Sequence, residues 1–178
     1  MEATANTKTT TKAPEDVAYT TTGEAFGPVT EHTDHWGKNP EAPVPETVEG
    51  LHDHLQQVAG DIGEASDLAE AVITYAPTSV EPLLWAIEGQ ASRAEKRLNE
   101  VTDALHNGHT ENVGHRLEDV GTMVLHLESV TQLALNKHSQ CEDNTEMVAG
   151  VLCNISNAIE YTRKRLDFLV YESDLPLD

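Results

Sequence analysis

Basic residues are scarce in this chain of 178 residues. Lys and Arg together number 11 against 31 Asp and Glu, which gives a formal net charge of -20. Such an excess of negative charge excludes a basic surface that follows a phosphate backbone, and it opposes binding to anionic membranes. We therefore expect neither direct nucleic-acid binding nor membrane binding. The one basic cluster, at residues 163–165, is expected to neutralise neighbouring acidic side chains.

Cysteine and long apolar runs are also scarce. Two cysteines, Cys141 and Cys153, are too few for the disulfide framework of a small secreted domain, so we expect free thiols in a reducing compartment. No stretch approaches the roughly 18 uninterrupted apolar residues of a membrane-spanning helix. Residues 1–45 also lack the apolar run of a signal peptide. These absences predict a cytoplasmic protein.

Residues 1–45 differ in composition from the rest of the chain. They are rich in Thr and Pro and show neither helical nor strand periodicity, which is typical of a flexible arm. Tyr19, Phe26 and Trp36 interrupt this polar segment. Spaced aromatic side chains in such an arm suit docking on a partner, because each can fill a pocket. The alternative is that they lie against the chain's own helices.

Residues 46–178 show helical periodicity in four segments and predict an all-α domain. Apolar residues recur in alternating steps of three and four within about 46–75, 79–107, 110–137 and 143–172. This spacing puts them in one stripe along each helix. Stripes of nearly equal length predict an antiparallel up-down four-helix bundle. A homodimer of two helical hairpins would satisfy the same pattern.

Residues that favour helix ends separate these segments. Thr78 followed by Glu81, and Asp143 followed by Glu146, have the spacing of a capping box. Asn107-Gly108 favours a helix end, because both residues tolerate the left-handed conformation. The first two connections are short, and the third is expected to be longer.

Nine histidines make a metal site the first chemistry to consider. A metal site in a bundle needs His and carboxylate side chains that project inward from facing helices. His52, His54, His106, His115 and His126 all fall outside the apolar stripes, and no predicted core position carries Asp or Glu. We therefore predict no metal and no cofactor.

The run at residues 115–121, His-Arg-Leu-Glu-Asp-Val-Gly, faintly resembles the histidine-containing phosphotransfer domains. Those domains are also four-helix bundles with an exposed histidine, so the resemblance implies His115 as a phosphoacceptor. It covers only these few residues. The family has a lysine three residues after the histidine and a glycine four residues after it. Here Glu118 and Asp119 occupy those positions and would repel a phosphoryl group.

Apolar residues also occur where the helical pattern calls for polar ones. Leu83, Trp85, Leu125 and Leu133 are displaced from the stripes. A wide core would absorb some of them. The alternative is a docking surface, since tryptophan is over-represented among residues that dominate binding energy.

These observations support three functional hypotheses. No glycine-rich phosphate loop or nucleophile elbow is present, so we do not expect an enzyme. The leading hypothesis is a protein–protein interaction or assembly module that binds another protein through the arm and an apolar flank of the bundle. The second is an acidic inhibitor, such as a nucleic-acid mimic, anti-defence or immunity protein, that blocks a basic site on its partner. The third is a signalling protein of the histidine-phosphotransfer kind.

Overall fold

Four α-helices form the described part of the chain. The structure is a computed structural model and describes residues 47–142 and 145–171. The helices are α2 (Val48–Ile73), α3 (Glu81–His106), α4 (Val113–His138) and α5 (Glu146–Tyr171), each of 26 residues. Within those ranges there is no strand, and no helix is long and apolar enough to cross a membrane. The predicted all-α fold is confirmed.

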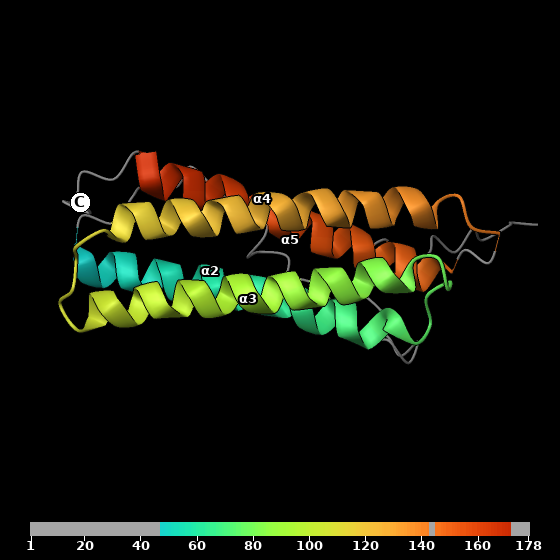
Figure 1. Cartoon of the computed structure of the whole chain (residues 1–178), viewed down its shortest axis with the longest axis horizontal. Coiled ribbons are helices and arrows are strands. Elements are labelled where there is room, and N and C mark those ends of the chain that lie inside the picture. Colours follow the sequence, from blue (N-terminus) through green and yellow to red (C-terminus); the bar gives the residue numbers. More distant parts are fainter. Residues whose placement is uncertain (1–46, 143–144, 172–178) are drawn as a thin grey trace, which may run out of the picture. The chain divides into compact units, whose positions relative to one another are not determined.

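The helices are arranged as an antiparallel up-down bundle (Figure 1). Each helix packs against two others, in the cyclic order α2, α3, α4, α5 and back to α2. The connections are residues 74–80, 107–112 and 139–145, so the third is no longer than the first, contrary to the prediction. Because these connections are short, consecutive helices must run antiparallel.

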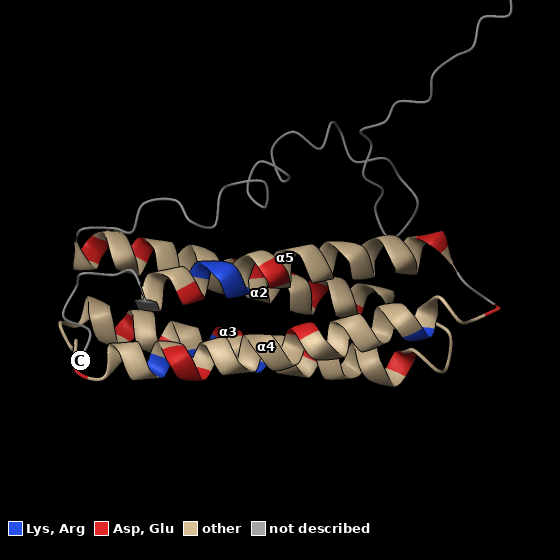
Figure 2. Ribbon diagram, turned by 90° about the horizontal axis from the view of Figure 1, so that it is seen from above, with Lys and Arg blue, Asp and Glu red and all other residues tan. Residues whose placement is uncertain are grey.

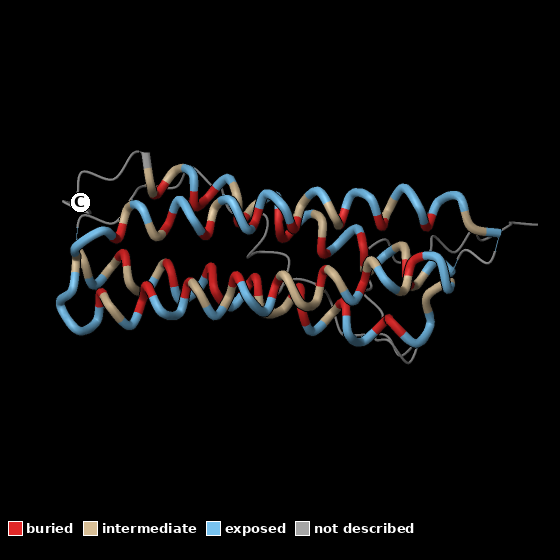
Figure 3. The backbone as a smooth tube through the Cα atoms, in the orientation of Figure 1, coloured by how far each residue is buried: buried red, intermediate tan, exposed pale blue. Residues whose placement is uncertain are grey.

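The core is a continuous apolar column enclosed by the four helices (Figure 3). The predicted stripe residues of all four segments are buried, except Val48 and Val151, which are partly buried. The second segment contributes Val80, Leu84, Ile87, Ala91, Ala94, Leu98, Val101 and Leu105. A stripe of this length removes a large apolar area from water only because a neighbouring stripe covers it from end to end.

The helix ends confirm one predicted signal. At the end of α3, Gly108 adopts φ +77 and donates to the Leu105 carbonyl at 3.0 Å, while His109 donates to the Ala104 carbonyl at 2.8 Å. This is the Schellman arrangement that Asn107-Gly108 predicted.

The prediction of a capping box at Thr78 and Glu81 is wrong. Val80 is the N-cap of α3, and no side-chain hydrogen bond caps this end. The Pro77 carbonyl accepts from the backbone N–H of Val80 at 2.7 Å and of Glu81 at 3.0 Å, which forms a turn ahead of the helix. Proline suits only the first turn of a helix, so Pro82 sets the start later than predicted. The other predicted cap, Asp143, lies outside the described residues.

The closest pair of helices is α2 and α3. Ser66 Oγ on α2 donates to the backbone carbonyl of Glu88 on α3 at 3.3 Å. A Cβ added at Gly63 would lie 3.0 Å from Glu95 Cδ, whereas a Cβ at Gly60 would meet nothing within 4 Å. The sequence allows these two glycines to provide either a bend or a close approach. At Gly63 the group that approaches closely is the Glu95 side chain of α3.

Alanine substitution at the two glycines is expected to separate helix propensity from packing. Gly60→Ala should raise the free energy of unfolding by about 0.5–1 kcal/mol, because alanine costs less backbone entropy in a helix. Gly63→Ala should gain clearly less, because its Cβ requires the Glu95 carboxylate to move. Thermal and denaturant unfolding of both variants checks this. Equal stabilisation by the two would contradict the close approach at Gly63.

Candidate interaction surfaces

The apolar residues displaced from the stripes fall into two groups. Leu83 is partly buried and packs against the core. Trp85, Leu125 and Leu133 have 51%, 50% and 54% of their surface exposed. The core beneath them is complete, so the fold does not require these three outward side chains. The predicted docking residues of the arm lie outside the described residues: Tyr19, Phe26 and Trp36.

The structure separates two residues that the sequence placed on one flank. Trp85 lies on α3 and Leu125 on α4. Arg97 Nη2 lies 3.8 Å from Asp119 Oδ2, which fixes the antiparallel register of these helices. In that register Trp85 is level with Leu133 rather than with Leu125. The apolar flank predicted from sequence is therefore two surfaces on two helices.

The first surface surrounds Trp85 and is acidic. Glu81 precedes Trp85 by four residues and Glu88 follows it by three, so both are its neighbours on the helix surface. The hydrogen bond from Ser66 to the Glu88 carbonyl places this turn of α3 against α2. Helix α2 itself contains no Lys or Arg. Its acidic residues outside the core are Glu49, Asp53, Glu64, Asp67 and Glu70.

The second surface is the outward face of α4, which carries no net charge. From 120 to 136 Glu128 is the single Asp, Glu, Lys or Arg of the helix, and His126 is exposed on the same stretch. Arg163 Nε on α5 donates to Glu128 Oε2 at 2.7 Å. Leu125 and Leu133 project from this face. In a chain of net charge -20, so long a stretch without free charge distinguishes this face from that of α2.

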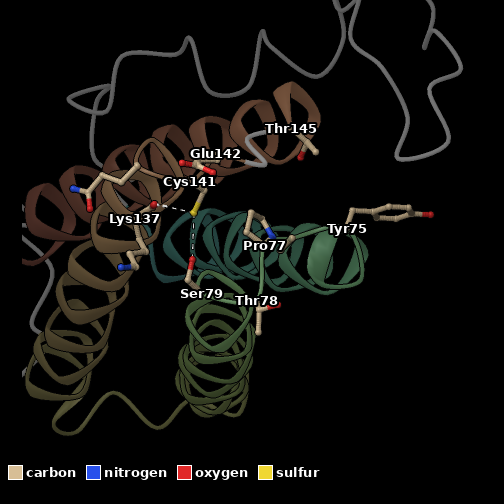
Figure 4. Close-up of a pocket in the computed structure, with 10 residues that line it drawn as sticks. Tyr75, Pro77, Thr78, Ser79, Lys137, Cys141, Glu142 and Thr145 are labelled. Carbon is tan, nitrogen blue, oxygen red and sulfur yellow. Dashed lines mark hydrogen bonds between the residues drawn. The ribbon is translucent and has the colours of Figure 1, made fainter.

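A shallow pocket of about 680 Å³ lies at the end of the bundle that contains the α2–α3 and α4–α5 connections. Ser79 Oγ lies 3.2 Å from Cys141 Sγ, which also donates to the Lys137 carbonyl at 3.3 Å (Figure 4). Tyr75 stands at the rim and points away from these residues (Figure 4). Within the described ranges no three His, Cys, Asp or Glu side chains are grouped to hold a metal ion.

The prediction that no histidine replaces a core residue is wrong at His138. Its side chain, in the last turn of α4, is 2% exposed, and Nε2 has no hydrogen-bond partner among the described residues. Burial lowers the pKa of His138, because the imidazolium loses hydration without gaining a partner. The sequence analysis missed this position, although His138 continues the three-four spacing through Thr131 and Ala134.

The lowered pKa predicts acid sensitivity. The folded state binds the His138 proton less readily than the unfolded state, so protonation favours unfolding. The contribution of neutral His138 to stability should be complete above the ordinary pKa of about 6.5 and decline as pH falls below it. The free energy of unfolding, measured with denaturant, should therefore fall more steeply for the wild type than for His138→Gln as the pH is lowered from about 7.5 to about 5.5. Parallel pH profiles would contradict this assignment.

The basic run at 163–165, the blue segment of α5 in Figure 2, divides into two kinds of residue. Arg163 pairs with Glu128 at 2.7 Å and with Asp167 at 3.1 Å. Lys164 pairs with Glu160 at 2.6 Å, and this hydrogen bond lowers the pKa of Glu160. The predicted neutralisation of neighbouring acids is confirmed for these two basic residues.

Arg165 does not share this role, because it is buried. Its side chain is 2% exposed, Nη2 lies 3.2 Å from His54 Nδ1 on α2, and Cζ lies 5.8 Å from the ring centroid of Phe168. Burial raises the pKa of Tyr161; the positive charge of Arg165 opposes this increase and the negative charge of Asp61 adds to it. A cation, an anion and a phenol thus lie near one another along α2 and α5.

Asp61 corrects a second prediction, that no core position carries Asp or Glu. It is 5% exposed on α2. Its negative charge and the positive charge of Arg165 both act on the pKa of Tyr161, in opposite directions. A buried carboxylate is tolerated where opposite charge and polar groups replace water. Sequence periodicity does not predict the burial of Asp61 or Arg165, because each lies at the edge of its own stripe.

Neighbouring substitutions on α5 should distinguish buried from surface charge. Arg165→Ala should lower the free energy of unfolding by about 3 kcal/mol, because it leaves buried polar groups without their cation. Lys164→Ala should cost less than about 1 kcal/mol, because its ion pair with Glu160 is half exposed. Chemical denaturation of the two variants measures the contrast. Equal losses would contradict a structural role for Arg165.

His115 is exposed on α4, as predicted. Its Nδ1 lies 3.5 Å from Glu118 Oε2, and the two side chains are 75% and 53% exposed. The carboxylate therefore lies beside one of the two ring nitrogens and places a negative charge next to the imidazole. Like-charge repulsion at this distance opposes a stable phosphohistidine.

Comparison with known proteins identifies no relative. No family model, curated protein or solved structure matches this chain.

Proposed function

We propose that this chain is a non-enzymatic protein–protein interaction module that binds a partner carrying basic residues. The observation that carries the proposal is the half-exposed Trp85 on the outward side of α3, with Glu81 and Glu88 one turn away on either side. Exposure of a large aromatic side chain to water is unfavourable in the free protein, and the core does not need this side chain. Covering it supplies binding energy, and tryptophan is the residue most enriched at such positions.

The chemistry around Trp85 favours an arginine-bearing or lysine-bearing partner. An indole face attracts a cation, and more so when the cation is shielded from water. The carboxylates of Glu81 and Glu88 pair with further basic groups at the rim of the contact. The acidic side of α2 extends the same sign of charge, so a partner segment with several positive charges would be steered toward this surface.

We propose from the sequence that the N-terminal arm also contacts the partner. Tyr19, Phe26 and Trp36 are spaced along a Thr- and Pro-rich segment that begins before α2. Each aromatic side chain can occupy a separate pocket on the partner. The arm would add contacts to those made by Trp85.

A matched set of variants tests the role of Trp85. Capture from cell extract should retain a partner with the full chain and with Tyr75→Ala, whose side chain is 52% exposed in the connection after α2. Trp85→Ala should weaken retention at least about tenfold, the effect of losing a residue that dominates binding. A chain that begins at residue 46 should also bind less. Far-ultraviolet circular dichroism should show unchanged helicity in both point variants.

Equal effects of Trp85→Ala and Tyr75→Ala would contradict the assignment, because general loss of surface aromatic area would then suffice. Retention by every variant would contradict it as well.

The acidic inhibitor remains the second candidate, and the absence of any basic residue on α2 favours it. An inhibitor of this kind would use the carboxylates as its principal contacts. Raising the salt concentration from about 0.1 M to about 1 M should then abolish binding, since exposed charges are screened beyond about 3 Å at the higher value. A Trp85-centred contact should lose only part of its affinity over this range. The salt series therefore decides between the two candidates.

A further inference from the structure

The outward face of α4 has a symmetric arrangement of residues about Ser129. Leu125 lies four residues before Ser129 and Leu133 four residues after it. Both leucines are at least half exposed. Thr122 and Asn136 lie seven residues to either side and are exposed too. Steps of seven and four keep all five residues on one side of a helix.

The same face contains a groove next to Leu133. Its lining residues are Glu128, Ser129, Gln132, Leu133 and Asn136. Positions 129, 132, 133 and 136 are spaced as the four residues that surround a hole in knobs-into-holes packing, where a side chain of a facing helix inserts. The spacing of its lining residues is therefore the one that accommodates a side chain of a facing helix.

Three polar donors on this face have hydrogen-bond partners within α4. Thr122 Oγ1 donates to the Glu118 carbonyl at 3.1 Å, and Ser129 Oγ donates to the Leu125 carbonyl at 3.0 Å. Gln132 Nε2 donates to Asn136 Oδ1 at 3.4 Å. Covering these groups would leave the hydroxyl donors and this amide pair bonded, which limits the desolvation cost.

Charge restricts which face two such molecules can share. Each copy carries a net charge of -20, so contact through α2 would bring carboxylates together. The face of α4 avoids this repulsion, because Glu128 is paired with Arg163 of the same chain at 2.7 Å. An uncharged, leucine-bearing face suits a partner that is itself uncharged at the contact.

We propose that two copies of this chain associate through α4, with the two α4 helices antiparallel about a two-fold axis at Ser129. The geometry places Leu125 of each copy against Leu133 of the other, at the groove formed by residues 129, 132, 133 and 136. Such an isologous contact uses the same residues twice, as two-fold symmetry requires. The occupant of the groove is thus Leu125 of the second copy.

This association goes beyond the proposed function and does not depend on it. Trp85 lies on α3 and keeps its exposed surface in the pair. The two contacts also respond to salt in opposite directions. Added salt screens the repulsion between two acidic molecules and strengthens self-association, whereas it weakens binding to a basic partner.

Sedimentation velocity of the full chain between about 1 and 500 µM tests the pairing, a range suited to a contact at the small end of interface sizes. The wild type should shift from monomer to dimer, and the dimer fraction should increase with salt. Leu125→Ser and Leu133→Ser should each weaken association at least about tenfold, since both leucines fill the contact. Trp85→Ser, an equally exposed residue on α3, should leave the dimer unchanged.

Disulfide trapping tests the antiparallel arrangement, in a chain whose own cysteines are replaced (Cys141→Ser and Cys153→Ser). Thr122→Cys chains mixed with Asn136→Cys chains should cross-link to each other under mild oxidation, because the proposed axis brings position 122 of one copy beside position 136 of the other. Ser129→Cys chains should cross-link to themselves. Thr122→Cys alone should remain monomeric.

Three results would overturn the proposal. The first is a wild type that stays monomeric throughout the concentration range. The second is a dimer that Leu125→Ser and Leu133→Ser do not weaken. The third is efficient self-cross-linking of Thr122→Cys without cross-linking to Asn136→Cys, which would indicate parallel helices. If the chain stays monomeric and the leucine variants lose a captured heterologous protein, the face belongs to that partner instead.

Discussion

The mutual coverage of four apolar stripes is the constraint on which the rest of the structure depends. Each helix has 26 residues. An apolar stripe is buried along its whole length only if the neighbouring helices run beside it for the same length. Equal length therefore decides where the chain turns, and the connecting residues gather at the two ends of the bundle. It also frees the outward faces, because the core is complete without any residue from them.

The seams between helices differ although the core is continuous. Between α2 and α3 small residues lie at the contact: Ser66 reaches a backbone carbonyl of α3, and Gly63 faces the Glu95 carboxylate. Along α2 and α5 buried polar groups are present instead, with Arg165 close to His54. A buried guanidinium loses hydration and gains specific partners, so it restricts how α5 can be positioned more than an apolar side chain would. The bundle thus combines one helix–helix contact made by small residues with another that includes buried charge.

Charge is distributed so that the two outward faces have different chemistry. Helix α2 has acidic residues and no basic ones, whereas the middle of α4 has one charged residue that α5 neutralises. Trp85 adjoins the acidic side, and Leu125 and Leu133 lie on the neutral one. Basic groups of a partner would be attracted to the first face. The second provides a place where two strongly acidic molecules can meet without repulsion between carboxylates.

The sequence determined the fold through its apolar spacing. The stripe residues, the helix-ending Asn107-Gly108 and the outward position of Trp85 all follow from local pattern, because helical periodicity alone decides which side chains can face a core. It also identified Leu125 and Leu133 as displaced from the stripe of α4. Helix starts were less accurate, since the turn before Pro82 depends on backbone hydrogen bonds that residue types do not specify.

Only the tertiary structure decided how these residues combine. It put Trp85 and Leu125 on separate faces and turned Leu83 against the core, because the register and rotation of α3 against α4 set the neighbours of each outward side chain. It buried Asp61 on α2 and Arg165 on α5, more than a hundred residues apart in sequence, so that the charges of both act on Tyr161. Local spacing contains no information about such buried charges, because their surroundings come from a different helix.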